Sequence, residues 1–264
     1  MITHSTGIDY DHSKNRHTIE GPRAAFGKLW PHNPPSSILD VGCGTGTWLR
    51  AALDYGVMDV CGIDGVEVPA ESLLIPAVHV HVMDLTKPID LKRRFAAALC
   101  LEVAEHLDPT ASDVLLDTLV THSDYIVFSA AIPDQAGQHH VNCQWPAWWQ
   151  ERFNERGYCC DDGLRWRMWE DTELEPWYRQ NMFIAYKDPK HASLEPRIRP
   201  VVHPEMLSSL SIGTTRESVL TDIIDGGMPV SWYFKTLGKA VCAKASRRAK
   251  ILSACIQRNT RTHV

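Results

Sequence analysis

The sequence predicts an α/β fold of the Rossmann-like, doubly wound type, with a mostly parallel seven-stranded sheet and a terminal antiparallel strand. Three observations lead to this fold class. Strand-like apolar runs alternate with helix-compatible stretches from residue 37 to residue 130. A glycine-rich turn follows the first apolar run, and two further apolar runs come late, within 158–188. Alternation of this kind indicates parallel strands with helices packed on both faces.

The first strand runs into the glycine-rich turn. The segment Ile38–Thr47 reads ILDVGCGTGT, in which an apolar run breaks into three glycines spaced two apart. Such a strand, turn and helix start is a place where ligands bind, because glycine lets the backbone approach a ligand and helix amides attract anionic groups. A dinucleotide fingerprint G-x-G-x-x-G requires a third glycine at position 47, which is Thr47. The spacing therefore disfavours a nicotinamide dinucleotide.

The remaining elements follow in order along the chain. Asp108 before Pro109 is a good helix start, since proline is favoured in the first turn. Gly157 is a good helix end. The predicted strands are Ser37–Val41, Asp59–Ile63, His79–Met83, Ala97–Leu101 and Tyr125–Ser129, with an antiparallel pair around Tyr158–Leu164 and Met182–Tyr186. The predicted helices are Arg23–Trp30, Thr47–Tyr55, Glu67–Leu74, Thr86–Arg94, Pro109–Thr121 and Pro146–Arg156.

Length and composition place these elements in four regions. The predicted regions are a polar helical arm or lid at 1–36, a cofactor-binding domain at 37–188, an irregular proline-rich segment at 189–230 and a basic tail at 231–264. No apolar run approaches the roughly 20 residues of a membrane span. The eight cysteines form no C-x-x-C pair, and we see no secretory signal, so we expect reduced thiols in the cytoplasm.

Two acids stand at the ends of predicted strands. Asp64 ends the second strand about 20 residues after the glycine turn, where a carboxylate can accept both hydroxyls of a ribose. Asp84 ends the third strand, where its carboxylate and the neighbouring amide can pair with an adenine ring. Each acid has an alternative role as the cap of the turn or helix that follows it.

The segment after the fourth strand, Leu99–Leu107, reads LCLEVAEHL. Together with the D-x-G-x-G-x-G turn, it resembles the class I S-adenosylmethionine (SAM) methyltransferases of the small-molecule branch, over residues 20–187. That family often carries an aspartate near position 99 or 100, which this chain lacks. The resemblance implies SAM as cofactor, S-adenosylhomocysteine as product, and a cofactor site formed by Asp40, Gly42, Cys43, Gly44, Gly46, Asp64, Gly65, Asp84, Leu85, Leu101 and Glu102.

Three histidines are candidates for the catalytic base, because imidazole takes up protons near neutral pH. His106 follows the fourth strand, and His139 and His140 lie in the loop Ala130–Pro146 after the fifth. The alternative is that Glu105 and His106 only hydrogen-bond the next loop, and that the loop is a packed structural element. Asp134, His139 and His140 match no specific metal-site spacing, so we predict no metal ligands and leave a divalent ion open.

The loop 130–146 and the segment Trp177–Asn181 also resemble bacterial methyltransferases of polysaccharide and glycolipid gene clusters. This resemblance implies transfer to an oxygen of a sugar-containing or other polar small molecule. Alternatives are N-methylation of a small amine, nucleic-acid methylation and a non-catalytic SAM-binding subunit. Asn33-Pro34-Pro35-Ser36 lies before the first strand and lacks the aromatic residue of base N-methylating enzymes, so nucleic acid is disfavoured.

The C-terminal tail differs from the rest of the chain in charge. The chain has a net charge of −5, yet residues 231–264 contain eight Lys or Arg and no Asp or Glu. Its apolar residues fall roughly on one helical face, which is typical of a helix lying on anionic lipid. We therefore expect a cytoplasmic protein with peripheral contact to the inner face of the membrane and a lipid-linked sugar as one acceptor. A solvated tail and a tail that contacts RNA are alternatives.

Overall fold

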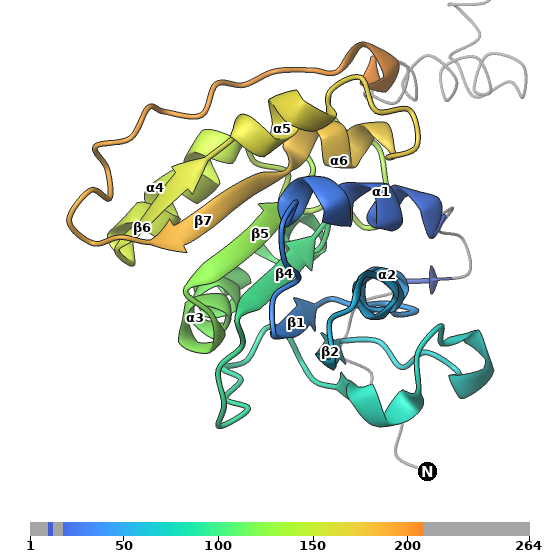
Figure 1. Cartoon of the computed structure of the whole chain (residues 1–264). Coiled ribbons are helices and arrows are strands. Elements are labelled where there is room, and N and C mark those ends of the chain that lie inside the picture. Colours follow the sequence, from blue (N-terminus) through green and yellow to red (C-terminus); the bar gives the residue numbers. More distant parts are fainter. Residues whose placement is uncertain (1–9, 13–17, 208–264) are drawn as a thin grey trace, which may run out of the picture. The chain divides into compact units, whose positions relative to one another are not determined.

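The computed structural model describes residues 10–12 and 18–207, and all the elements below lie within them (Figure 1). A seven-stranded sheet runs in the order β3-β2-β1-β4-β5-β7-β6. The first five strands are parallel, and β7 is antiparallel to both β5 and β6. This confirms the predicted fold class. The strands are β1 Ser37–Val41, β2 Asp59–Asp64, β3 Val80–Val82, β4 Ala97–Leu101, β5 Tyr125–Ser129, β6 Tyr158–Asp161 and β7 Phe183–Lys187.

Helices cover both faces of the sheet. The strands are apolar on both sides, so neighbouring residues such as Ile38 and Leu39 enter opposite hydrophobic cores. One core contains side chains of α3 (Ser112–His122) and α4 (Pro146–Glu155). The other contains side chains of α1 (Glu20–Leu29), α2 (Thr47–Tyr55), α5 (Gly163–Met168) and α6 (Pro176–Asn181). This two-sided packing leaves the strand ends as the place for a site.

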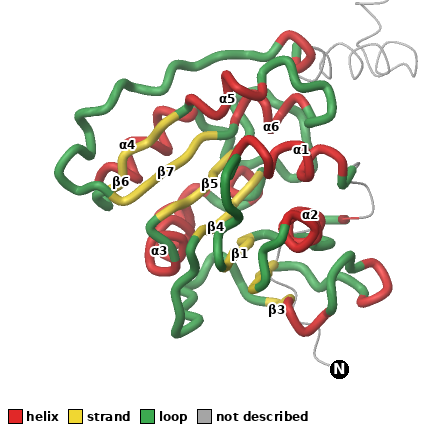
Figure 2. Tube along the Cα trace, in the orientation of Figure 1, coloured by secondary structure: helices red, strands yellow, loops and turns green. Residues whose placement is uncertain are grey.

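Two predicted helices are wrong. The stretch 67–74 contains only the 3-10 turn Ala70–Ser72, and 86–94 contains no helix (Figure 2). Both stretches contain proline, at Pro69 and Pro88, which removes a backbone donor. The carboxylate of Asp84 also accepts the Thr86 amide at 2.9 Å, which favours a local turn over a helix. The connections on both sides of β3 are therefore irregular.

The segments that flank the sheet in sequence are tied to it. Phe26 and Leu29 of α1 are buried in the core that α2 shares, so α1 is packed into the protein. The described part of the proline-rich segment is irregular, but Glu195 accepts hydrogen bonds from the Asn154 side chain at 2.6 Å and the Cys160 amide at 3.1 Å. Residues 208–264, including the basic tail, lie outside the described residues, and the domain boundaries stay predictions.

The described helices and cysteines add two observations. No helix among the described residues is long and apolar enough to cross a membrane. The six cysteines described, at positions 43, 61, 100, 143, 159 and 160, are all free thiols.

Candidate active site

A cavity of about 860 Å³ opens at the carboxyl ends of β1, β2 and β4. This is the edge at which parallel α/β sheets bind ligands. The glycine turn, the residues after β4, the loop after β5 and the start of α6 all contribute to its wall. Of the predicted cofactor residues, nine line it: Asp40, Gly42, Cys43, Gly44, Asp64, Gly65, Leu85, Leu101 and Glu102.

The glycine turn has a shape that other residues would not allow. Gly42 has φ of +81°, and a Cβ there would lie 2.3 Å from Cγ2 of Val103. The Gly42 amide donates to the Ile63 carbonyl at 2.7 Å, which ties the turn to β2. Gly44 has φ of +51°, and a Cβ there would point at the ring of His12. The turn is therefore folded closely against the sheet and leaves its outer side to the cavity.

Asp64 fixes the glycine turn through hydrogen bonds. Its carboxylate accepts the Gly44 amide at 2.7 Å and the Val66 amide at 2.8 Å, and Nε2 of His12 lies 3.5 Å away. Asp40, at the end of β1, is 3% exposed. Burial, and then the nearby charge of Asp64, raise the pKa of Asp40 to about 8.

The cavity wall is acidic. Among the described residues that line the cavity, six are carboxylic acids and none is a lysine or arginine. The acids are Asp40, Asp64, Glu102, Glu105, Glu175 and Glu205. A wall with carboxylic acids and no basic side chain among its described residues suits a cationic ligand and disfavours a polyphosphate. The charge, like the sequence of the glycine turn, therefore disfavours a dinucleotide.

Two predicted cofactor residues do not line the cavity. Gly46, with φ of +80°, precedes α2 as its N-cap. The carboxylate of Asp84 accepts both the amide and the hydroxyl of Thr86, at 2.9 and 2.6 Å, which is the capping role given as the alternative. The contact of Asp84 with adenine remains a prediction that no observation tests.

Glu102, directly after β4, is held in a strained backbone conformation with φ of +55°. Two amide side chains orient its carboxylate: Nε2 of Gln135 at 3.0 Å and Nδ2 of Asn181 at 3.1 Å. Burial raises the pKa of Glu102 to about 7, although these hydrogen bonds favour its charged form. Non-glycine residues with positive φ cluster at functional sites, because only surrounding structure can hold them there.

Glu105, His106 and His140 come together although 34 residues separate the histidines in sequence. The amides of Val141 and Asn142 both donate to the Glu105 carbonyl, at 2.9 and 3.0 Å, which brings the loop after β5 against the turn after β4. Burial, and then the neighbouring His140, lower the pKa of His106 to about 4. Burial also lowers the pKa of His140. Both imidazoles are neutral at neutral pH and able to accept a proton.

The third histidine lies elsewhere. His139 is exposed and is not among the cavity-lining residues. The tryptophans that follow the loop are also outside the cavity: Trp149 packs on Phe128 in the core, and Trp148 stacks on Arg152. The loop therefore contributes amides and one imidazole to the cavity, but no indole.

Several residues that line the cavity were not among the predicted site residues, and of these Trp177 and Tyr178 lie in a segment that the sequence singled out. Tyr10 and His12 reach the cavity from the N-terminal segment, and the Tyr10 ring lies 4.6 Å from the ring of His106. Trp177 and Tyr178 line the cavity from α6, where Tyr178 packs edge-on against Trp48. The predicted arm or lid at 1–36 remains a prediction. Thr18 hydrogen-bonds Glu175 and also lines the cavity.

With this geometry established, comparison with known proteins identifies the family. A family model described as a methyltransferase domain matches residues 12–177. The chain belongs to this methyltransferase family. It is a SAM-dependent methyltransferase, and SAM is its cofactor. No curated protein matches the chain.

Solved structures similar to this methyltransferase are distant in sequence. The methyltransferase domain of bacterial CtHen1-C is 16% identical, covers 65% of this chain and 100% of its own, and has a TM-score of 0.49. DesVI of Streptomyces venezuelae is 15% identical, with coverages of 64% and 92% and a TM-score of 0.48. Magnesium protoporphyrin IX methyltransferase (ChlM) of Synechocystis PCC 6803, solved with bound SAH, is 14% identical. It covers 64% of this chain and 84% of its own, and its TM-score is 0.47.

The residues of the cavity fit SAM. The cofactor carries a positive sulfonium and an ammonium group, and the acidic wall complements both. Among the described residues, no side chain caps α2, so its first amides are open to the cofactor carboxylate. Asp64 and Glu102 both line the cavity, and the contact of Asp64 with the ribose remains a prediction. SAM supplies an already activated methyl group, so the protein needs to align the acceptor, exclude water and take up a proton.

Proposed function

We propose that this methyltransferase transfers the methyl group of SAM to an oxygen of a sugar-containing or other polar small molecule. The observation that carries this proposal is the pair of neutral histidines, His106 and His140, beside Glu105 in the cavity wall. A hydroxyl acceptor must lose a proton as its oxygen bonds to carbon, and the bond from that carbon to sulfur breaks. These groups provide a place for the proton.

The lining supports a polar acceptor. Trp177 offers an aromatic face, and the amides of Gln135 and Gln138, which hydrogen-bond Glu102 and Asp11, make the neighbouring wall polar, which together suits a sugar ring. The branch of methyltransferases found in polysaccharide and glycolipid clusters enters the proposal through the sequence of 130–146 and 177–181. The basic tail, 231–264, is proposed to bring the enzyme to anionic membrane where lipid-linked sugars reside.

A second candidate is N-methylation of a small amine, and one observation favours it. Six acids and no lysine or arginine among the described lining residues attract an ammonium ion as well as a sulfonium. The same wall disfavours nucleic acid, since a phosphate backbone requires basic contacts.

The test is an acceptor screen with methyl-labelled SAM. Calorimetry with S-adenosylhomocysteine, and with NAD as the control ligand, first verifies that the purified protein is competent to bind. Nucleotide sugars, glycolipids and small amines are then compared, and mass spectrometry locates the added methyl group. Methylation of a hydroxyl supports the proposal. Methylation of amines alone would transfer it to the second candidate.

A further inference from the structure

The cluster of Glu105, His106 and His140 has the composition and spacing of a metal site. One carboxylate oxygen and two imidazole nitrogens lie within 4.8 Å of one another in the cavity wall. Two atoms that bind one ion at about 2.2 Å lie at most about 4.4 Å apart, so a closure of roughly half an ångström brings all three into contact with it. We infer that Glu105, His106 and His140 bind a divalent transition-metal ion in this cavity.

The Glu105 carboxyl group is buried and has no cationic partner among the described residues. Its side chain is completely buried, and neither oxygen has a hydrogen-bond donor among the described residues. Nor does the described part of the chain contain an ion pair to Glu105 or to its neighbour Glu102. An ionised carboxylate in such surroundings is strongly disfavoured unless it is paired or bound to a metal. A bound ion would satisfy Glu105, and the charge of Glu102 would add to the attraction.

The two imidazoles are prepared as ligands. Nδ1 of His140 lies 2.8 Å from the Gln135 carbonyl, which fixes the ring and leaves Nε2 for an ion. Backbone carbonyls orient metal-binding histidines in this way. Nδ1 of His106 is buried and has no hydrogen-bond partner among the described residues.

The set of ligands selects the kind of ion. Two imidazoles with a carboxylate suit Mn²⁺, Fe²⁺, Co²⁺ or Zn²⁺, whereas Mg²⁺ and Ca²⁺ prefer oxygen ligands throughout. Three protein ligands leave positions open toward the cavity. The nearby Glu102 is held by Gln135 and Asn181, so its carboxylate stays beside the cluster.

The role of this ion rests on the proposed function, although its binding does not. A hydroxyl of the acceptor that binds at an open position has a lowered pKa, because the ion stabilises the oxygen anion. With the ion bound, the two imidazoles and Glu105 are its ligands and no longer receive the proton, so the hydroxyl proton leaves to solvent. The oxygen electron pair forms the bond to the methyl carbon, and the pair of the broken carbon–sulfur bond stays on sulfur. Sugars with neighbouring hydroxyls are the acceptor class that fits two open positions.

The experiment measures binding of Mn²⁺ to the full chain after treatment with EDTA. Electron paramagnetic resonance follows the loss of the free Mn²⁺ signal, and Co²⁺ absorption in the visible range reports imidazole ligation. We expect about one ion per chain, and a loss of affinity of about 10-fold or more in His140→Ala and in Glu105→Gln. His139→Ala is the matched control, since His139 is adjacent in sequence but exposed and outside the cavity, and it keeps the affinity of the unmodified protein.

The result can be read without the variants and without an acceptor. Nitrogen coupling to bound Mn²⁺ in the unmodified protein demonstrates imidazole ligands even if a variant fails to fold. Absence of stoichiometric binding, or equal affinity in His140→Ala, would overturn the metal site. If the ion binds but sugars are not methylated, only the proposed acceptor fails. If sugars are methylated equally after EDTA and no ion binds, the proposed function survives without the metal.

Discussion

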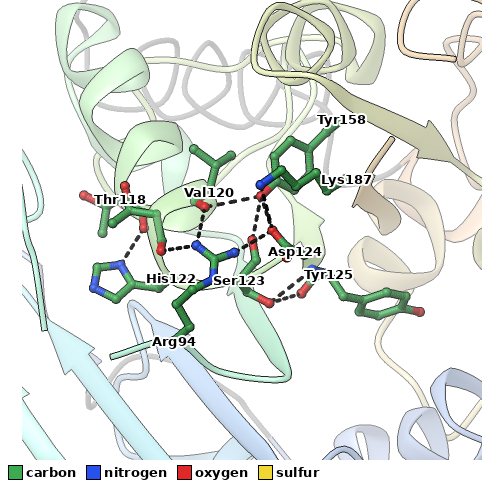
Figure 3. A network of polar contacts seen from close by, with 10 residues as sticks. Arg94, Thr118, Val120, His122, Ser123, Asp124, Tyr125, Tyr158 and Lys187 are labelled. Atoms are coloured by element: carbon green, nitrogen blue, oxygen red, sulfur yellow. Dashed lines mark hydrogen bonds and ion pairs between the residues drawn. The ribbon is translucent and has the colours of Figure 1, made fainter. Parts of the chain in front are cut away.

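Two polar regions at opposite ends of the same strands differ in how their groups are paired. At the amino ends of β4 and β5, Arg94 contacts the Thr121 carbonyl and Asp124, and the Tyr158 hydroxyl donates to the Ser123 carbonyl at 2.7 Å (Figure 3). His122 is fully buried, but both ring nitrogens have partners. At the carboxyl ends, Glu105 is equally buried and both its oxygens lack donors within the described chain.

This contrast separates a structural network from a functional site. A satisfied buried network stabilises the fold, whereas an unsatisfied buried charge costs free energy. Such a cost persists where a ligand or a reaction makes use of it. The fold therefore places its stabilising polar groups at one edge of the sheet and its chemistry at the other.

The largest expected effect is on stability at the structural end. In His122→Leu the Leu91 amide, which donates to Nε2 at 2.9 Å, loses its partner in a buried position. We expect the free energy of unfolding to fall by about 2–3 kcal/mol, with SAM affinity unchanged in the folded protein. Urea denaturation measures this. In Tyr158→Phe we expect a smaller fall in the free energy of unfolding, of about 1 kcal/mol. If both variants were as stable as the unmodified protein, the structural role of this network would be contradicted.

At the carboxyl ends of the strands, the same comparison predicts a loss of activity with little change in stability. Burial, and then the charge of Glu102, raise the pKa of Glu105 well above its usual range. Glu105→Gln replaces this acid by a neutral group of equal size, so stability should change by less than about 1 kcal/mol. Turnover should fall about 100-fold. Urea denaturation and methyl transfer, measured on one preparation, test this prediction. A large loss of stability with turnover retained would assign Glu105 a structural role instead of a role in the reaction.

A smaller effect is expected at the cofactor. Asp64→Ala removes the carboxylate that orders the Gly44 amide and that we assign to the ribose. Calorimetry should show SAM affinity weakened by roughly 10- to 100-fold, the range for hydrogen bonds to a charged group. Asp108→Ala is the control, because Asp108 makes the same kind of cap with Thr110 and does not line the cavity. Unchanged affinity in Asp64→Ala would refute the ribose contact.

The smallest effect is a proton released when SAM binds. The pKa of Asp40 is about 8, against a usual value of 3.8, so the free folded protein holds this proton at pH 7. Because the folded pKa is raised, Asp40 makes unliganded stability fall as pH rises from about 4 to about 8. A cationic cofactor lowers that pKa, so binding should release up to about one proton at pH 7 and none well above pH 8.

Calorimetry in buffers with different ionisation enthalpies measures the proton count. Asp40→Asn should abolish the release while the protein still folds, since Asn resembles the protonated acid. Release that is unchanged in Asp40→Asn would assign the proton to another group, for which Glu102, with a pKa of about 7, is the next candidate.

The predictions from sequence succeeded where local rules act. The glycine turn, the bounds of β1, β4, β5 and α2, and the antiparallel pair follow from residue period and turn chemistry, which short segments carry by themselves. They failed at 67–74 and 86–94, where proline and a competing aspartate turn outweigh helix propensity. No metal spacing is recognisable in 134–140 for a different reason, since the other two residues of the inferred metal site lie after β4.

By itself, the sequence determined the fold class, the glycine turn with Asp64, and thereby the cofactor class. Only the tertiary structure decided which histidine enters the cavity. His139 and His140 are indistinguishable in the linear chain, and the hydrogen bonds of the Val141 and Asn142 amides to the Glu105 carbonyl bring His140 to Glu105 and His106. The chemistry of the site depends on such contacts between distant segments, which no local pattern encodes.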